Sequence, residues 1–233
     1  MVEALTQFAL RIPLENIDRQ VPRHWLHRQV EGMEWYQVYD LLEVFAEYVD
    51  IFTSKRVSSE QFYQGANRVL ADENAGYRFV AGRLTEITSP TEVAAIEEAL
   101  AMADHHGMRG VEEHLRQSLS LLGKRPQPDY RNAIKEAISA VESAAKRIAR
   151  EKKGTLDDAL DLLDQRMPLH GALKGGLTKL YGFTSDSSGI RHALLDAPTV
   201  DASDARFFVV ACAAFVSWLV TKADAAGLLQ APR

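Results

Sequence analysis

The stretch Asp129-Tyr-Arg-Asn-Ala-Ile-Lys-Glu-Ala-Ile-Ser-Ala-Val-Glu-Ser-Ala-Ala-Lys-Arg-Ile148 places an apolar residue at every third or fourth position. This is the period of an amphipathic α-helix with one buried face. Asp129 is a suitable N-cap, and Gly154 follows the basic residues at the end of the stretch. The spacing therefore predicts a long helix over about 130–152.

Most of the remaining chain is also helical in pattern. Helical spacing extends over the ranges 24–52, 60–70, 89 to about 107, and 109–122, and further helices are expected to begin near Thr155, at Pro168 and near Asp201 or Ser203. Two short segments, Tyr77-Arg-Phe-Val80 and Arg83-Leu-Thr-Glu-Ile87, are instead β-branched or aromatic and flank Ala81-Gly82. They predict a small hairpin near 77–87 in a mainly α fold.

A domain boundary is predicted at Lys124-Arg-Pro-Gln-Pro-Asp129, where two prolines in three residues block a helix. Residues 1–122 then form an N-terminal mixed α domain with the hairpin. Residues 123–233 form a bundle of four main helices.

Composition places the chain among ordinary globular proteins, with 46% apolar and 25% charged residues. The formal net charge of −5 argues against a dedicated nucleic-acid binder when taken for the whole chain. The charge is unevenly divided, however, because residues 1–122 hold 11 basic and 19 acidic side chains and residues 123–233 hold 16 and 13. A charge of about +3 for the C-terminal part suits a small local phosphate site.

Neither a membrane span nor a disulfide is expected. The apolar stretch 207–220 is shorter than the roughly 20 residues that cross a bilayer, so a buried helix in a soluble cytoplasmic protein is the better interpretation. Cys212 is the single cysteine and is expected in the core. We expect one helix face to join the bundle core and the opposite face to be covered, with a partner subunit as one candidate. The expected core face is Phe207, Val210, Ala214 and Trp218, and the opposite face is Phe208, Cys212, Phe215 and Leu219.

Common catalytic motifs are absent from the sequence, including phosphate-binding glycine loops, His-Glu-x-x-His and Gly-x-Ser-x-Gly. The adjacent pair His105-His106 points about 100° apart on a helix, and we expect it to face solvent. Arg109 and His114 are likewise expected on a solvated helix face. No metal and no cofactor are therefore expected.

The richest polar segment is Thr184-Ser-Asp-Ser-Ser-Gly-Ile-Arg-His192, which lies between two apolar helices. The guanidinium of Arg191 suits a phosphate, and His192 has the side chain best suited to acid–base catalysis near neutral pH. An alternative interpretation is structural, because Asp186 and the serines can cap the next helix while Arg191 forms an ion pair.

Several blocks of this sequence together resemble a known family. They are Tyr77-Arg-Phe-Val80, Thr85-Glu-Ile-Thr88, Pro128 to Glu142, Leu180 to His192, Ala205-Arg-Phe-Phe208 and Ala214-Phe215. In this order they resemble AbiJ-type abortive-infection proteins, in which a variable N-terminal domain precedes a HEPN-like helical bundle. The resemblance covers about 70–233 and is strongest over 126–218. It implies a homodimer formed through the C-terminal bundle and a metal-independent endoribonuclease in phage defence.

The resemblance also implies roles for particular residues. Arg191 and His192 match the first two positions of the HEPN signature, whereas Ala193-Leu-Leu-Asp-Ala-Pro198 lacks its downstream histidine. Either His192 or Asp186 then performs acid–base catalysis, or the domain binds RNA or a nucleotide without cutting it. The remaining site predictions are substrate contacts from Tyr181, Ser185, Ser187 and Ser188. Glu136 and Glu142 lie away from the apolar stripe of helix 130–152, where they either orient Arg191 or belong to a solvated helix face.

Two other classes of function stay open at this stage. One is a non-catalytic dimerisation module that senses a ligand or partner, and the other is a structural homodimer without a ligand. The N-terminal domain is a candidate sensor of a phage signal or an antitoxin of unknown identity. Its aromatic residues are expected mainly in the core; they are Trp25, Trp35, Tyr36, Tyr39, Phe45 and Tyr48.

Overall fold

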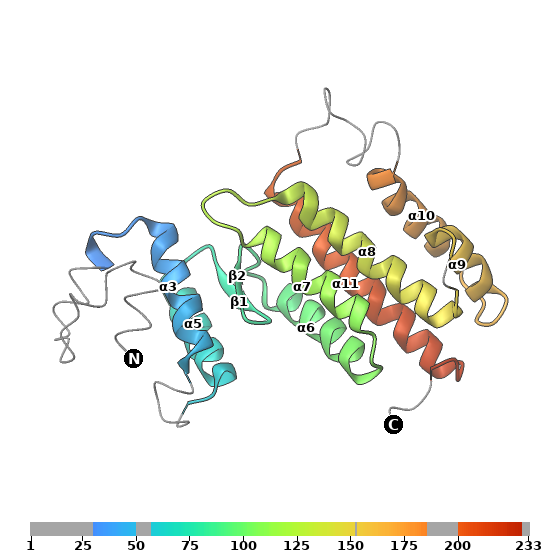
Figure 1. Cartoon of the computed structure of the whole chain (residues 1–233), viewed down its shortest axis with the longest axis horizontal. Coiled ribbons are helices and arrows are strands. Elements are labelled where there is room, and N and C mark those ends of the chain that lie inside the picture. The colour runs from blue at the N-terminus through green and yellow to red at the C-terminus, as the bar shows by residue number, and fades with distance from the viewer. Residues whose placement is uncertain (1–29, 50–56, 152, 186–199, 230–233) are drawn as a thin grey trace. The chain divides into compact units, whose positions relative to one another are not determined.

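The computed structural model describes residues 30–49, 57–151, 153–185 and 200–229. It confirms a mainly helical fold with one two-stranded hairpin (Figure 1). The elements in chain order are α3 (Trp35–Glu47), α5 (Ser59–Asp72), β1 (Arg78–Val80), β2 (Arg83–Thr85), α6 (Pro90–His105), α7 (Arg109–Leu122), α8 (Tyr130–Ala149), α9 (Leu156–Asp164), α10 (Gly171–Ser185) and α11 (Ala202–Ala225).

The chain divides into two compact units, Met1–Leu84 and Thr85–Arg233. The sequence instead placed the boundary between residues 122 and 123. The proline-containing segment after α7 is a loop between two packed helices, and the amide of Asp129 donates a hydrogen bond to the carbonyl oxygen of Leu121 at 3.0 Å. Prolines end a helix equally well in a domain linker and in such a loop, so the pattern alone does not separate the two cases.

The second unit is built around α6, α7, α8 and α11, which pack against one another (Figure 1). Helices α9 and α10 lie outside this group and contact α8. The central four helices therefore differ from the predicted four, because α6 and α7 belong to the bundle. Ser118 of α7 is fully buried, and its hydroxyl donates to the Ala133 carbonyl oxygen of α8 at 2.8 Å, which satisfies its polar atom inside the core.

The ends of the helices follow local capping chemistry. Asp129 caps α8 by accepting a hydrogen bond from the amide of Asn132, as the sequence predicts. The helix ends at Ala149, three residues before the predicted end, because Arg150 adopts a left-handed conformation with φ of 60°. Helix α10 begins at Gly171 rather than at Pro168.

Asp201 caps α11, the longest described helix. Its carboxylate accepts hydrogen bonds from the Ser203 hydroxyl at 2.6 Å, the Ser203 amide at 2.8 Å and the Asp204 amide at 3.0 Å. The Ser203 hydroxyl, followed by the Asp204 amide, lowers the pKa of Asp201 below its ordinary value of 3.8. The ionised cap therefore stabilises the folded protein at pH values above the ordinary pKa of the Asp201 carboxyl. This stabilisation is lost as the pH falls through the lower pKa that Asp201 has in the folded state.

Replacing Asp201 with alanine is expected to lower the urea midpoint of unfolding at pH 7. The difference in urea midpoint between the variant and the wild-type protein should become smaller as the pH is lowered towards 3, because protonation of Asp201 weakens the cap in the wild-type protein. Urea titrations followed by circular dichroism across this pH range measure both effects. Asp201→Asn is the control, since asparagine also caps helices but does not titrate. A difference in urea midpoint that does not change with pH would show that the charge of Asp201 does not contribute to the cap.

The orientation of α11 is opposite to the prediction. Phe208, Cys212 and Leu219 are buried in the bundle, whereas Phe207 is 57% exposed and Ala214 is also exposed. Apolar residues occur around the whole circumference of this helix, so its period does not define which face is inside. Burial raises the pKa of the Cys212 thiol to about 12, and the prediction of a core cysteine is confirmed.

Helix α11 also has the length and composition of a membrane-crossing helix. It is the one helix with these properties among the described residues, and 44% of its most apolar stretch is buried in the protein. Core helices of soluble proteins share the same properties, so the finding alone does not place the helix in a bilayer.

The first unit holds α3 and α5 against the hairpin. Its core consists of Ala46, Phe79 and Leu84, with Tyr39 and other half-buried side chains packed around it. The Asn67 side chain fixes β1 by two hydrogen bonds to the backbone of Phe79, at 2.7 and 2.9 Å. Trp35 is 50% exposed, so the predicted aromatic core is only partly formed by the described residues. Trp25 lies outside them.

Candidate functional site

The predicted catalytic segment joins the last two helices of the second unit. Ser185 is the final residue of α10, and Asp201 caps α11. Asp186, Ser187, Ser188, Arg191 and His192 lie between these helix ends and outside the described residues. Their proposed roles therefore stay predictions, and what the structure defines is the pair of anchors that hold this segment at both ends.

Helix α10, the first anchor, is tied to α9 by polar contacts. The Lys174 ammonium lies 2.5 Å from a carboxylate oxygen of Asp161 and 3.6 Å from one of Asp164, and the hydrogen bond to Asp161 raises the pKa of Lys174. Thr178 donates its hydroxyl to Asp157 at 2.6 Å. These contacts fix the direction in which α10 enters the polar segment. Tyr181, a predicted substrate contact, is half-buried near the end of this helix.

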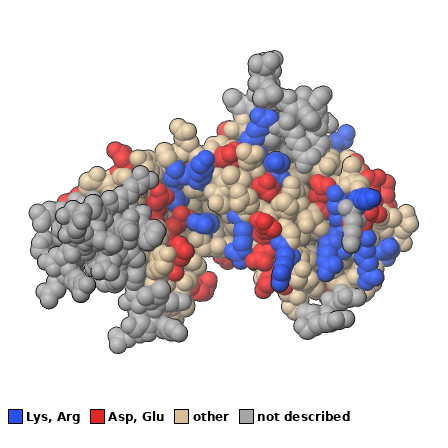
Figure 2. All heavy atoms as spheres, viewed as in Figure 1, with Lys and Arg blue, Asp and Glu red and all other residues tan. Residues whose placement is uncertain are grey.

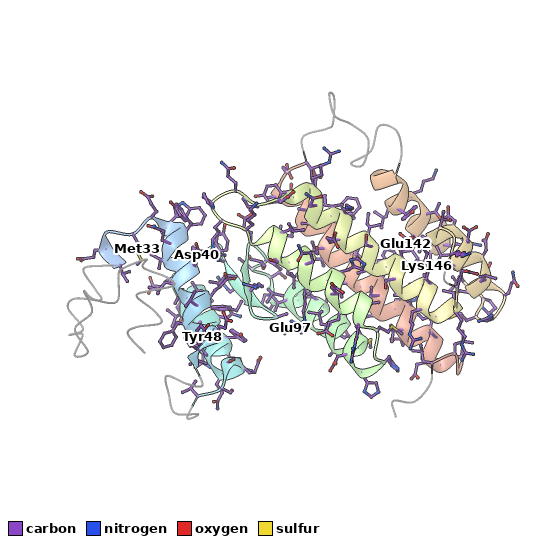
Figure 3. All side chains as sticks on the ribbon, in the orientation of Figure 1. Met33, Asp40, Tyr48, Glu97, Glu142 and Lys146 are labelled. Carbon is purple, nitrogen blue, oxygen red and sulfur yellow. The ribbon has the colours of Figure 1, made fainter. Side chains whose placement is uncertain are left out.

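Glu142, one of the two predicted orienting carboxylates, is paired within α8. Its carboxylate lies 2.6 Å from the Lys146 ammonium, and the side chains are only 18% and 25% exposed. Figure 3 labels both residues on the part of α8 that contacts α9 and α10. Glu142 is therefore already paired with a cation of its own helix.

Glu136, the other predicted orienting carboxylate, contacts a different helix. Its oxygen lies 2.7 Å from Nδ1 of His114 on α7, with the side chains 20% and 37% exposed. Six residues of α-helix correspond to a rotation of about 240°, so Glu136 and Glu142 point in different directions from α8. The structure does not bring the two carboxylates together. It brings together His114 and Glu136, which are 22 residues apart, and sequence spacing gave no signal for that pair.

The other histidines do not form a metal site within the described parts of the chain. His105 is exposed, as predicted, whereas His106 is half-buried and its Nδ1 has no hydrogen-bond partner among the described residues. Their rings meet edge to face at 4.8 Å.

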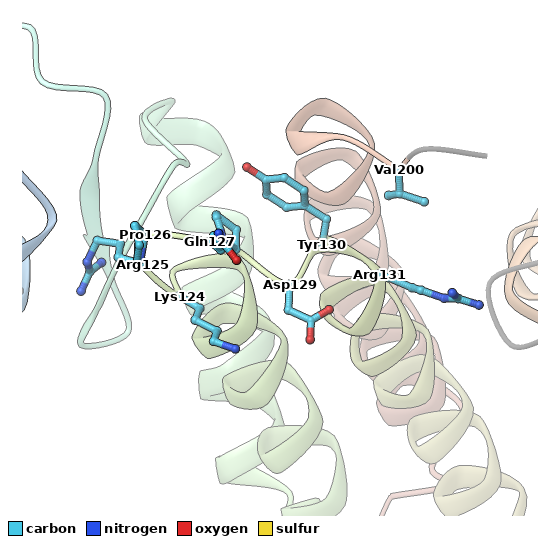
Figure 4. A pocket seen from close by; sticks show the side chains of 9 residues that line it. Lys124, Arg125, Pro126, Gln127, Asp129, Tyr130, Arg131 and Val200 are labelled. Atoms are coloured by element: carbon cyan, nitrogen blue, oxygen red, sulfur yellow. The ribbon is translucent and has the colours of Figure 1, made fainter. Parts of the chain in front are cut away.

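A surface cavity of about 620 Å³ lies at the loop between α7 and α8. Lys124, Arg125 and Arg131 line it, but Figure 4 shows their side chains pointing in three different directions. A single phosphate therefore does not meet all three cations. In Figure 2 the basic side chains on the visible face alternate with acidic ones rather than forming a continuous basic tract. Neither observation indicates an extended nucleic-acid groove on the face that Figure 2 shows.

The described residues form a mainly helical protein of two compact units. A segment rich in polar residues connects its last two helices, α10 and α11. Residues 4–102 match the family model described as AbiJ N-terminal domain 4. This part of the chain is therefore similar to the N-terminal domains of AbiJ-type proteins. It ends within α6 and leaves α7 to α11 outside it. No curated protein and no solved structure matches the chain.

Proposed function

We propose that this protein is an abortive-infection effector that cleaves RNA without a metal ion. Its active centre is the polar segment that contains Arg191 and His192, in a HEPN-like helical bundle. The observation that supports this proposal most directly is the attachment of that segment to two helices of one compact unit, α10 and α11. The AbiJ-type match of residues 4–102 supports the role in defence.

The proposed chemistry is an internal transesterification of RNA. His192 or Asp186 removes the proton from a ribose 2′-hydroxyl, and the 2′-oxygen forms a bond to the adjacent phosphorus. The bond from phosphorus to the 5′-oxygen breaks, and an acid protonates that leaving oxygen. The products are a 2′,3′-cyclic phosphate and a 5′-hydroxyl end. Arg191 stabilises the negative charge that grows on the phosphoryl oxygens.

The partners of the protein follow from the same proposal. Two copies would bring two Arg191 and two His192 side chains into one cleft, with Tyr181 and the serines of the segment as substrate contacts. We place the protein in the cytoplasm, where RNA is available. The first unit is a candidate sensor for a phage component or an antitoxin.

A second candidate function is non-catalytic. The range 193–198 contains no histidine, and Glu142 is already paired with Lys146. These observations favour a dimerisation module that binds a ligand or partner through the same polar segment. This alternative predicts no RNA cleavage by the pure protein at any concentration.

Incubating the purified full-length protein with total RNA in the presence of EDTA distinguishes the two functions. We expect cleavage that EDTA does not reduce, with 5′-hydroxyl and 2′,3′-cyclic phosphate ends when the fragments are sequenced. A parallel reaction with added Mg²⁺ controls for metal dependence. Intact RNA in both reactions would support the non-catalytic alternative, and cleavage only with Mg²⁺ would exclude the proposed chemistry.

A further inference from the structure

The N-terminal end of α3 presents an aromatic surface to solvent. Trp35 is 50% exposed, and its ring centroid lies 5.9 Å from that of Tyr36 and 6.0 Å from that of Tyr39. The ring of Tyr77, which precedes β1, lies 5.9 Å from Trp35 and 4.7 Å from Tyr39. Because Tyr39 and Tyr77 also pack against the core of the first unit, they hold the exposed indole in place. We call these four residues the Trp35 platform.

The helix that carries the Trp35 platform is acidic. Residues 30–49 contain five carboxylates and neither lysine nor arginine; the carboxylates are those of Glu31, Glu34, Asp40, Glu43 and Glu47. Glu31, Glu34 and Asp40 are exposed, and Figure 3 labels Asp40 on this part of α3. Glu34 is the neighbour of Trp35, and the five residues from Trp35 to Asp40 rise about 7.5 Å along the helix. A short extended ligand that covers the indole therefore also reaches carboxylates.

The arginines of the first unit do not cancel this charge. Arg78 donates hydrogen bonds to two backbone carbonyl oxygens at 2.6 Å, and Arg83 lies 3.9 Å from a carboxylate oxygen of Glu43. Arg68 lies on α5. Residues 30–49 and 57–84 together hold eight carboxylates and three basic residues, which are these arginines. The described part of this unit therefore has a surplus of negative charge, which favours a cationic ligand.

We propose that the Trp35 platform binds a basic segment of a partner protein. An arginine or lysine side chain of that segment would lie over the exposed indole, because the face of an aromatic ring attracts a cation. An arginine would also stack flat on the ring. Glu34, beside the ring, would accept a hydrogen bond from the same or the next cation. The inference rests on the sensor role of the first unit in the proposed function, and it names the chemistry of what that sensor binds.

Charge separates a basic segment from the other occupants of an exposed aromatic surface. RNA and anionic lipid headgroups carry the same sign of charge as α3 and are repelled. A second copy of the same surface would bring five further carboxylates against these five, so self-association is disfavoured as well. A neutral apolar segment would cover the indole without any interaction with the carboxylates. A partner with basic side chains makes use of both features.

Fluorescence anisotropy of a labelled peptide measures this binding with the full-length protein. The probe is a short peptide of alternating glycine and arginine, and a peptide with glutamate in place of arginine is its counterpart. We expect the arginine peptide to bind and the glutamate peptide not to bind. Trp35→Leu should raise the Kd for the arginine peptide at least about 10-fold. Trp35→Phe keeps an aromatic ring and should have a smaller effect.

Two matched controls separate the platform from the overall charge and from aromatic exposure in general. Glu34→Gln should raise the Kd about 2- to 5-fold. Glu60→Gln makes the same change in net charge and should leave the Kd nearly unchanged, because Glu60 follows Ser59, whose hydroxyl donates to the Ala46 carbonyl oxygen near the other end of α3 at 3.4 Å. Phe207→Leu removes a ring that is 57% exposed in the second unit, and it should likewise have no effect.

Circular dichroism of each variant verifies its helical content before the Kd values are compared. A wild-type protein that does not bind the arginine peptide would overturn the proposal, as would equal binding by Trp35→Leu or equal losses in Glu34→Gln and Glu60→Gln. Binding of the glutamate peptide or of phosphatidylglycerol vesicles that is lost in Trp35→Leu would assign the platform to another occupant. These outcomes are independent of RNA cleavage, because no RNA is present and the Arg191→Ala protein should bind the arginine peptide as the wild-type protein does.

Discussion

Arg191→Ala is expected to reduce RNA cleavage by about 10²- to 10³-fold and to remove any growth arrest caused by expressing the protein in bacteria. The size of the effect follows from losing a fixed positive donor where charge develops in the transition state. The loss should appear in the rate at saturating RNA more than in RNA affinity, because one phosphate contact contributes little to binding. Single-turnover cleavage at several RNA concentrations separates the two quantities.

Two further variants make this experiment specific. Arg191→Lys keeps the charge without the planar fork of the guanidinium, so an intermediate rate is expected. Arg147→Ala removes an exposed cation from α8 and is the matched control, which should leave cleavage unchanged. Unchanged cleavage by Arg191→Ala, with native circular dichroism, would remove Arg191 from the mechanism. Equal losses in Arg191→Ala and Arg147→Ala would point to overall charge instead.

The capped starts of α8 and α11 are well predicted from the sequence, because local chemistry sets them, whereas the end of α8 and the start of α10 each differ by three residues from the prediction. Asp129 and Asp201 cap α8 and α11 through hydrogen bonds to amides within three residues, and such short-range partners can be recognised along the chain. The hairpin is confirmed for a similar reason, since Ala81 and Gly82 both adopt positive φ in its two-residue turn. These features depend on neighbours in sequence.

Features that depend on distant partners could not be predicted in the same way. Apolar residues surround α11 on all sides, so only its packing against α6 and α8 decides that Phe208 is buried and Phe207 is exposed. The contact between His114 and Glu136 likewise requires α7 and α8 to be antiparallel neighbours. For the candidate site, the sequence predicted the two helices that flank the polar segment. Arg191 and His192 lie outside the described residues, so their catalytic roles stay predictions.

The position of the boundary between the units has the largest expected consequence for folding. A fragment of residues 85–233 should fold cooperatively, because it keeps α6, α7, α8 and α11 together. A fragment of residues 123–233, cut at the boundary that the prolines suggest, should not. The two fragments differ only in α6, α7 and the segments beside them.

The energetic reason is the apolar surface that α6 and α7 contribute to the bundle. Ile96, Leu100, Val111, Leu115, Leu119 and Leu122 are all at most 5% exposed. Burial of one such side chain stabilises a fold by roughly 1.5–3 kcal/mol, so the loss of all six removes a large part of the apolar burial that holds α8 and α11 in the bundle. The shorter fragment loses these contacts and leaves the facing surfaces of α8 and α11 in water.

Thermal unfolding followed by circular dichroism and amide dispersion in NMR spectra distinguish the two fragments. We expect a single sharp transition and dispersed signals for residues 85–233, and a broad transition with collapsed signals or aggregation for residues 123–233. Leu115→Ala in the longer fragment is an internal check, since a cavity at this buried site should cost about 2–5 kcal/mol and lower the transition temperature. Cooperative unfolding of the shorter fragment would show that α8 to α11 form a domain by themselves and that α6 and α7 only cover it.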